Sequence, residues 1–193
     1  MSRKTLVYMD IDGVLANCDH RLHYIDERDY EGFYSADSIL ADEVNPNGEK
    51  LISMLLLSSP INVDIAYITG RPERARQSTC AWFALNQIYP LPSQSRFGQG
   101  ILYMREDGDH RDSGLLKPKM IVDDIIARLS SGCHYTDKEK KKIPKMDVEE
   151  LEDRILKEYD QVLVIDDDPE NIRAIEEVFP RFTCLVFGTS RIV

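Results

Sequence analysis

The 193-residue sequence has little cysteine and no long apolar stretch. Its cysteines are far apart and form no CxxC pair, so we expect free thiols rather than a disulfide framework or a zinc site at Cys18, Cys80, Cys133 and Cys184. The apolar runs are too short to cross a bilayer. Too few apolar residues follow the charged start Met-Ser-Arg-Lys to form a secretion signal, so we expect a cytoplasmic protein.

Positive charge is also scarce. The chain has 24 lysines and arginines against 34 aspartates and glutamates, a formal net charge of −10. Broad, nonspecific nucleic-acid binding needs a basic face, so this composition argues against it, while a small basic pocket for a phosphate stays possible. The length predicts a single domain over residues 1–193, large enough to bury a core.

The most informative stretch begins with an apolar run, Leu6 to Met9, which predicts a buried strand. Two carboxylates follow, Asp10 and Asp12, and then Gly13, which permits a sharp turn. If the strand continued through Asp12, alternation would place both acids on one face. Such a pair suits a Mg²⁺ ion, because a cation relieves the repulsion between the carboxylates. The alternative is an Asp-Gly turn with solvated acids.

A second strand is predicted over residues 63–69, followed by a helix that runs to about residue 87. The junction, Thr69-Gly70-Arg71, is suited to an anion. Thr69 offers a hydroxyl donor, Gly70 allows close backbone approach, and Arg71 offers a bidentate phosphate contact. The alternative is an ordinary connection in which Thr69 caps the helix.

A third strand is predicted over residues 101–104, followed by a polar loop and a helix over about 114–129. Lys117 lies in the first turn of this helix, where a cation is unfavourable unless an anion compensates it. Pro118 favours Lys117 over Lys119 as the residue at the helix entrance. The alternative is a solvated lysine.

The last unit repeats the pattern of the first. An apolar strand over 162–165 is followed by Asp166 and Asp167, then by a helix to about residue 178 and a fifth strand over 184–187. Apolar strands that alternate with helices predict a parallel sheet covered on both faces. Ligands of such sheets bind beyond the carboxyl ends of the strands, so we expect the singled-out side chains to converge there: Asp10, Asp12, Thr69, Asp166 and Asp167.

Two segments lie outside this pattern. Residues 17–47 are polar and aromatic, and we interpret them as a lid, or as a surface loop with a small cluster under Tyr30, Phe33 and Tyr34, before a helix over 48–58. Residues 130–160 predict an inserted helical hairpin. Its basic tetrad, Lys138 with Lys140 to Lys142, either contacts a polyanion or forms a solvated face, and the solvated face is the commoner case.

In this order, the motifs resemble those of the haloacid dehalogenase superfamily of phosphohydrolases. Asp10-Ile11-Asp12-Gly13-Val14-Leu15 is similar to its first motif, Thr69-Gly70-Arg71 to the second, Lys117 to the third and Asp166-Asp167 to the fourth. The resemblance implies a Rossmann-like, three-layer α/β fold with five parallel strands. It is closest to the phosphatase domain of phage polynucleotide kinase-phosphatases, but this chain lacks a Walker-type kinase motif.

The resemblance also implies a mechanism. Asp10 would attack phosphorus to form an aspartyl-phosphate, and Asp12 would act as general acid and then base. Thr69 and Lys117 would hold the phosphoryl oxygens. Mg²⁺ would be bound by Asp10, Asp12, Asp166 and Asp167. Asp12 would bind the ion through its backbone carbonyl.

The expected partner is a nucleotide or a 3′-phosphate nucleic-acid end, as for a polynucleotide 3′-phosphatase. The expected substrate contacts are Gly70, Arg71, Arg105, Arg111, His20 and Arg21. One alternative is a phosphatase of another small metabolite, such as a sugar phosphate. Another is a noncatalytic phosphate-binding protein of the same fold, which the intact Asp10, Asp12 and Lys117 disfavour.

Overall fold

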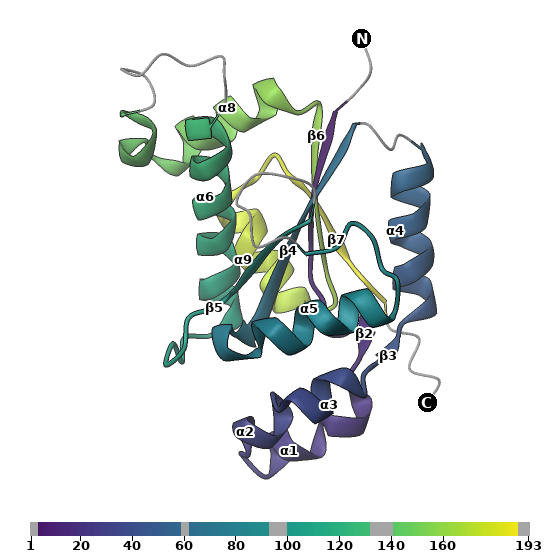
Figure 1. Cartoon of the computed structure of the whole chain (residues 1–193). Coiled ribbons are helices and arrows are strands. Elements are labelled where there is room, and N and C mark those ends of the chain that lie inside the picture. The colour runs from purple at the N-terminus through teal and green to yellow at the C-terminus, as the bar shows by residue number, and fades with distance from the viewer. Residues whose placement is uncertain (1–3, 59–61, 93–99, 132–140, 189–193) are drawn as a thin grey trace.

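The computed structural model describes residues 4–58, 62–92, 100–131 and 141–188. Its centre is a five-stranded parallel sheet in the order β5-β4-β1-β6-β7 (Figure 1). The strands are β1 (Thr5–Met9), β4 (Val63–Pro72), β5 (Ile101–Arg105), β6 (Gln161–Asp166) and β7 (Thr183–Val186). The sheet and its parallel arrangement confirm the predicted Rossmann-like α/β fold.

The sheet is built around β1, which pairs with β4 on one side and with β6 on the other. Its residues from Leu6 to Met9 have no solvent-exposed surface. A strand buried on both faces needs apolar side chains at every position, which is why the run does not alternate with polar residues. β1 is therefore the central strand, and the residue that follows it lies in the middle of the sheet edge.

Helices cover both faces of the sheet (Figure 1). On one face α6 (Ser113–Ser131), α8 (Val148–Glu158) and α9 (Pro169–Val178) close a core that includes Ile121, Ile155 and Ile175. On the other face a second core, which includes Trp82 and Phe83, lies under α4 (Pro46–Ser58) and α5 (Arg76–Leu85). The short helix η2 (Glu73–Ala75) precedes α5. These layers complete the three-layer architecture.

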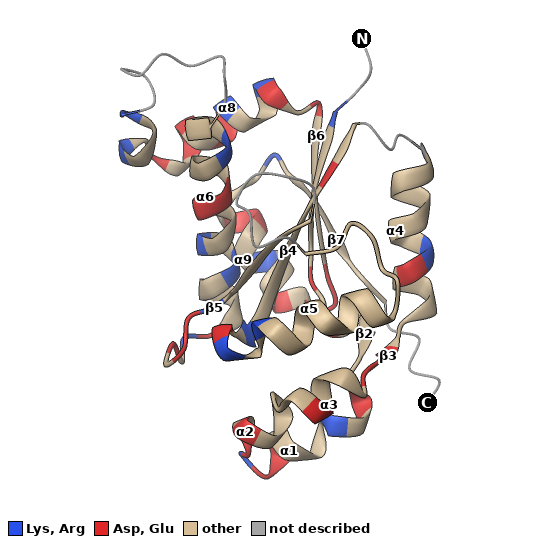
Figure 2. Ribbon diagram, viewed as in Figure 1, with Lys and Arg blue, Asp and Glu red and all other residues tan. Residues whose placement is uncertain are grey.

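The segment between β1 and α4 projects beyond the carboxyl ends of the strands (Figure 1). It contains η1 (Asp19–Arg21), α1 (His23–Asp26), α2 (Tyr30–Phe33) and α3 (Ala36–Leu40), between β2 (Ala16–Asn17) and β3 (Glu43–Val44), which pair in antiparallel fashion. We call residues 18–42 the helical segment. Phe33 is buried, but Tyr30 is 55% exposed, so the predicted aromatic cluster does not include Tyr30. Along the helical segment, aspartate and glutamate outnumber lysine and arginine (Figure 2).

The 130–160 region contributes η3 (Ile143–Lys145) and α8, and Leu151 and Ile155 of α8 belong to the same core as α6. The predicted first arm of the hairpin falls mostly on residues 132–140, outside the described residues. Cys18, Cys80 and Cys184 are free thiols, and Cys133 is also outside the described residues. Within the described ranges, no helix has the length and apolarity that a membrane span requires.

Candidate active site

Three carboxylates meet at the centre of the sheet edge. Asp10 directly follows β1, and its backbone N–H donates to the carbonyl of Ile165 in β6 at 2.9 Å. Asp166 ends β6 and Asp167 follows it, so the neighbouring strands bring the acids together. One carboxylate oxygen from each of Asp10, Asp166 and Asp167 lies within 4.8 Å of the others. The convergence expected of these three residues is present.

Lys117 reaches into this cluster from α6. Its Nζ donates to Asp10 Oδ2 at 2.7 Å and to Asp166 Oδ2 at 2.5 Å, and the residue is 2% exposed. The helix begins at Ser113, so Lys117 is its fifth residue, and Pro118 lies inside the helix rather than at its entrance. That correction removes the helix-dipole argument and leaves the carboxylates as the reason for a buried lysine. Lys119 instead pairs with Asp123 at the surface, at 2.7 Å.

The electrostatics of the cluster favour a cation. Burial raises the pKa of Asp10 well above its ordinary value, although Lys117 opposes this, and burial with the nearby Asp166 raises the pKa of Asp167 to about 6. Burial lowers the pKa of Lys117, but Asp10 and Asp166 outweigh it, so the net shift is upward. The single lysine therefore leaves the acids undercompensated. Three carboxylates with this shortage of positive charge fit a divalent ion that prefers oxygen ligands.

Asp12 turns away from this cluster. β1 ends at Met9, and the N–H groups of Leu15 and Ala16 both donate to the carbonyl of Ile11, so the chain bends and strand alternation does not reach Asp12. Its carboxylate accepts from Arg71 Nη2 at 2.6 Å and from Arg21 Nη2 at 2.7 Å. The condition that the strand continues through Asp12 is not met, because β1 ends at Met9, so strand alternation does not place these two carboxylates on one face.

The two arginines form a buried network with a second aspartate. Asp42, from the helical segment, accepts from Arg21 Nε at 2.7 Å and from Arg71 Nη2 at 2.7 Å, and all three side chains have no exposed surface. Burial raises the pKa of Asp12, but Arg71 and Arg21 outweigh it and lower the pKa overall. Sequence reasoning missed Asp42, because a lone acid in a polar segment looks like any solvated one. Arg21 and Arg71, expected at the substrate, instead hold carboxylates.

The Thr69-Gly70-Arg71 junction differs from the helix-cap prediction, and its Arg71 is already bonded to carboxylates. β4 runs to Pro72, so Thr69 is no helix cap, and its Oγ1 accepts from the Arg71 N–H at 3.2 Å. Gly70 lines the pocket described below. Arg105 links this junction to the start of α6. Its Nε donates to the Gly70 carbonyl at 3.0 Å, and its Nη2 donates to Ser113 Oγ at 3.2 Å.

The remaining predicted contacts, Arg111 and His20, lie outside the pocket that contains the acidic cluster. Arg111 is half exposed and pairs with Asp109. The Nε2 of His20 lies 3.1 Å from the carbonyl of Ser38 within the helical segment. Neither Arg111 nor His20 is among the described residues that line the pocket.

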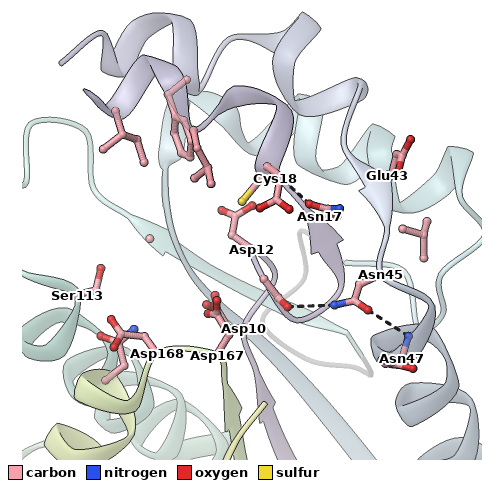
Figure 3. A pocket seen from close by; sticks show the side chains of 18 of the residues that line it. Asp10, Asp12, Asn17, Cys18, Glu43, Asn45, Asn47, Ser113, Asp167 and Asp168 are labelled. Atoms are coloured by element: carbon pink, nitrogen blue, oxygen red, sulfur yellow. Dashed lines mark hydrogen bonds between the residues drawn. The ribbon is translucent and has the colours of Figure 1, made fainter. Parts of the chain in front are cut away.

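A pocket of about 1210 Å³ lies between the sheet edge and the helical segment (Figure 3). Asp10, Asp12, Lys117 and Asp167 line its floor, and Asp166 does not reach it. Its other walls contain the polar side chains Asn17, Glu43, Asn45 and Asn47 and the apolar or aromatic side chains Leu22, Ile25, Phe33 and Tyr34. This volume exceeds that of common small-molecule pockets, about 300–1,000 Å³, so the pocket has room for more than a phosphate.

Comparison with known proteins places the fold. No known family profile and no curated protein sequence matches this chain. Among solved structures, the Pnkp1/Rnl/Hen1 complex has a TM-score of 0.57 at 17% identity, over 96% of this chain and 46% of that chain. The Pnkp1/Rnl/Hen1 RNA repair complex has a TM-score of 0.56 at 17% identity, over 96% and 42%. A Class C acid phosphatase from Bacillus anthracis has a TM-score of 0.45 at 16% identity, over 89% and 54%.

The similarity to the first two of these structures is a similarity of fold. This chain spans a little under half the length of the first two matched chains. The shared feature is therefore the α/β architecture with its five-stranded sheet, and the chemistry of the site has to be argued from its own residues.

Gly13→Ala should strongly impair the site. Gly13 has φ of +79°, and a Cβ there would lie 2.0 Å from Asp167 Oδ2, so Asp167 has to move. Misplacing one such group by about 1 Å costs on the order of 10²-fold in rate, and we expect a loss of that size in kcat/KM for the reaction proposed below.

Gly108→Ala is the matched control. Gly108 has φ of +82°, but nothing lies within 4 Å of the position that a Cβ would take, so this variant has the same backbone strain without the collision. It should retain most of the activity. Equal losses in the two variants would show that backbone strain, and not the contact with Asp167, sets the effect.

Proposed function

We propose that this protein is a Mg²⁺-dependent phosphomonoester hydrolase that acts through an aspartyl-phosphate on a nucleotide or a 3′-phosphate nucleic-acid end. The observation that carries the proposal is the position of Asp10. Asp10 lies on the pocket floor, is hydrogen-bonded to Lys117 and is close to the carboxylates of Asp166 and Asp167. Asp12, which is bonded to Arg21 and Arg71, lines the same pocket. A nucleophile, a cationic partner, an acidic cluster and a candidate acid are thus assembled in one place.

Asp10 is proposed as the nucleophile. Its carboxylate attacks phosphorus, and the alkoxide departs from the opposite side. Lys117 holds Asp10 in place and supplies positive charge to the phosphoryl oxygens as charge spreads in the transition state. Thr69 and Gly70 are proposed to bind the phosphoryl oxygens, Thr69 through the hydroxyl of its fully buried side chain and Gly70 through its backbone at the pocket wall.

Asp12 is proposed to protonate the leaving group and then to take a proton from the attacking water. Its Oδ1 accepts bonds from both Arg21 and Arg71, whereas its Oδ2 accepts a single bond, from Arg71 Nε at 3.1 Å. Oδ2 is therefore the atom proposed for proton transfer. The arginines favour the carboxylate form, which suits the base of the second step and opposes the protonated form that the first step requires.

Asp10 and Asp167 are proposed to hold the Mg²⁺ ion. Asp166 is fully buried, and its oxygens already accept from Lys117 Nζ, the Asp168 N–H and Asn171 Nδ2. Asp167 lines the pocket. Asp166 thus orients Lys117, and the backbone carbonyl of Asp12 is proposed as a further ligand. When bound, the ion would neutralise the phosphoryl oxygens and bring them to Asp10.

Arg21 and Arg71 are proposed to act through Asp12, while Arg105, Arg111 and His20 are kept as candidates for contact with a larger substrate. The shared fold with the Pnkp1/Rnl/Hen1 RNA repair complex supports keeping a nucleic-acid end among the substrates.

A screen for phosphate release tests this function. The substrates are nucleoside 3′- and 5′-monophosphates, 3′-phosphorylated oligonucleotides, sugar phosphates and p-nitrophenyl phosphate, each after chelation and again with added Mg²⁺. We expect hydrolysis only with the metal, and the Asp167→Asn variant should need more Mg²⁺ for half its maximal rate. Hydrolysis that survives chelation would contradict the metal role, and no hydrolysis of any substrate would contradict the function.

A further inference from the structure

The charge of the pocket wall distinguishes the two substrates named above. Among the described residues that line the pocket, six are acidic and Lys117 is the one cation. Lys117 is already bonded to Asp10 and Asp166. Arg21 and Arg71 are fully buried and bonded to Asp12 and Asp42, so neither faces the pocket as a free cation.

Three of the acids have no cation to balance them. Asp10 and Asp167 are assigned to the proposed metal and Asp12 to the arginines, which leaves Asp19, Glu43 and Asp168 at the rim. None of these three forms an ion pair with another described residue. Glu43 lies on the side of the pocket away from Asp167 and Asp168 (Figure 3), so negative charge is present on both sides.

A polyanionic substrate would meet this charge. Proteins that hold single-stranded nucleic acid track its backbone with a basic groove, and phosphate contacts to lysine and arginine supply most of the affinity. The described walls offer no such groove, and the chain carries a net charge of −10. Every phosphodiester beyond the reacting phosphate would therefore enter a repulsive field.

The rest of the wall suits an uncharged carrier. Asn17, Asn45 and Asn47 place amide groups along β2 and the start of α4 (Figure 3). Asn45 is used by the protein, because its Nδ2 donates to the Gly13 carbonyl and its Oδ1 accepts from the Asn47 N–H. Asn17 Oδ1 accepts from the Asp19 N–H, while its Nδ2 has no partner among the described residues. Amides of this kind recognise hydroxyl groups and base edges.

The helical segment adds an apolar wall. Leu22, Ile25, Phe33 and Tyr34 line the pocket, and one face of the Phe33 ring is covered by the Arg21 guanidinium at 4.2 Å. Phe33 and Tyr34 pack edge to face, with centroids 4.8 Å apart. An apolar wall beside the amide nitrogen of Asn17, which is unbonded among the described residues, fits a flat ring with hydrogen-bonding edges, which is the chemistry of a nucleoside.

We propose that the preferred substrate is a nucleoside monophosphate, with one phosphoryl group on an uncharged carrier, and that the acidic rim discriminates against polymeric 3′-phosphate ends. This inference rests on the proposed hydrolase function and narrows its substrate.

The test compares kcat/KM for a nucleoside 3′-monophosphate and for the dinucleotide that ends in the same nucleotide. The dinucleotide adds one phosphodiester charge, and we expect kcat/KM to be lower by on the order of tenfold at low salt, less at high salt. A dinucleotide with an uncharged methylphosphonate linkage has the same size and should recover most of the loss. Glycerol phosphate, which lacks the base, should be poorer than the mononucleotide.

Variants locate the repulsion. Glu43→Gln should raise the ratio of dinucleotide to mononucleotide efficiency, whereas Glu177→Gln, at an exposed site in α9 that does not line the pocket, should leave this ratio unchanged. A dinucleotide as good as the mononucleotide, or a methylphosphonate as poor as the charged dinucleotide, would overturn the inference. Either result with p-nitrophenyl phosphate still hydrolysed leaves the hydrolase function standing, whereas loss of all hydrolysis overturns both.

Discussion

The Asp10→Asn variant should fold normally and lose at least about 10³-fold in kcat for every phosphomonoester, as expected when a nucleophile is removed. The asparagine amide is no nucleophile towards phosphorus, yet its oxygen can still accept the bond from Lys117 Nζ. Phosphate release at saturating substrate and Mg²⁺ measures the loss. Acid quenching of the wild type with labelled substrate should trap labelled protein, and the variant should trap none.

Thermal unfolding separates a chemical role of Asp10 from a structural one. Burial raises the pKa of Asp10, so asparagine removes an unfavourable buried charge, and Lys117 keeps Asp166 as its carboxylate partner. We therefore expect little change in Tm. Asp123→Asn, at an exposed site on α6, is the control and should change neither rate nor Tm. An Asp10→Asn protein that hydrolyses substrate at the wild-type rate would exclude Asp10 as the nucleophile.

The strand-end carboxylates could be predicted because their placement depends on local sequence alone. An apolar run that ends in aspartate defines both a buried strand and the residue at its carboxyl end. Parallel strands then bring such residues to one edge, which is how Asp10, Asp166 and Asp167 come within 4.8 Å. The same reasoning gave the five strands of the main sheet and the helices α4, α5, α6 and α9 to within a few residues, but not the short helices between β2 and β3.

Long side chains could not be placed in the same way. An arginine next to a glycine is as suitable for a phosphate as for a carboxylate, and the partner of Arg71 depends on which acids the fold buries beside it. The deciding residue, Asp42, is 29 positions away in sequence and is brought in by the helical segment. Lys117 does reach the carboxylates, but the helix-entrance argument for it fails, since the helix begins at Ser113.

The Asp42→Asn variant tests whether this buried network matters. Asp42 has no exposed surface and bonds both arginines, so the substitution leaves two buried guanidinium groups with Asp12 as their one carboxylate partner. Breaking a buried ion pair costs about 3–5 kcal/mol, which corresponds to a fall in Tm of roughly 6–20 °C for a chain of this size. Asp37→Asn, an exposed acid in α3, is the matched control and should unfold like the wild type.

Activity should reveal a second effect, because the same arginines hold Asp12. If Asp42 positions the general acid through them, its loss should matter most for leaving groups that need a proton. At a temperature where the variant is fully folded, kcat should fall more for a nucleotide, whose leaving alcohol is weakly acidic, than for p-nitrophenyl phosphate, whose leaving phenolate is stable without a proton. Equal losses on both substrates would limit Asp42 to a structural role, whereas an unchanged Tm would contradict the buried network itself. A larger fall in kcat for the nucleotide than for p-nitrophenyl phosphate would show that the helical segment contributes to catalysis. Asp42, the one carboxylate that this segment buries, would then position the proposed proton donor, Asp12.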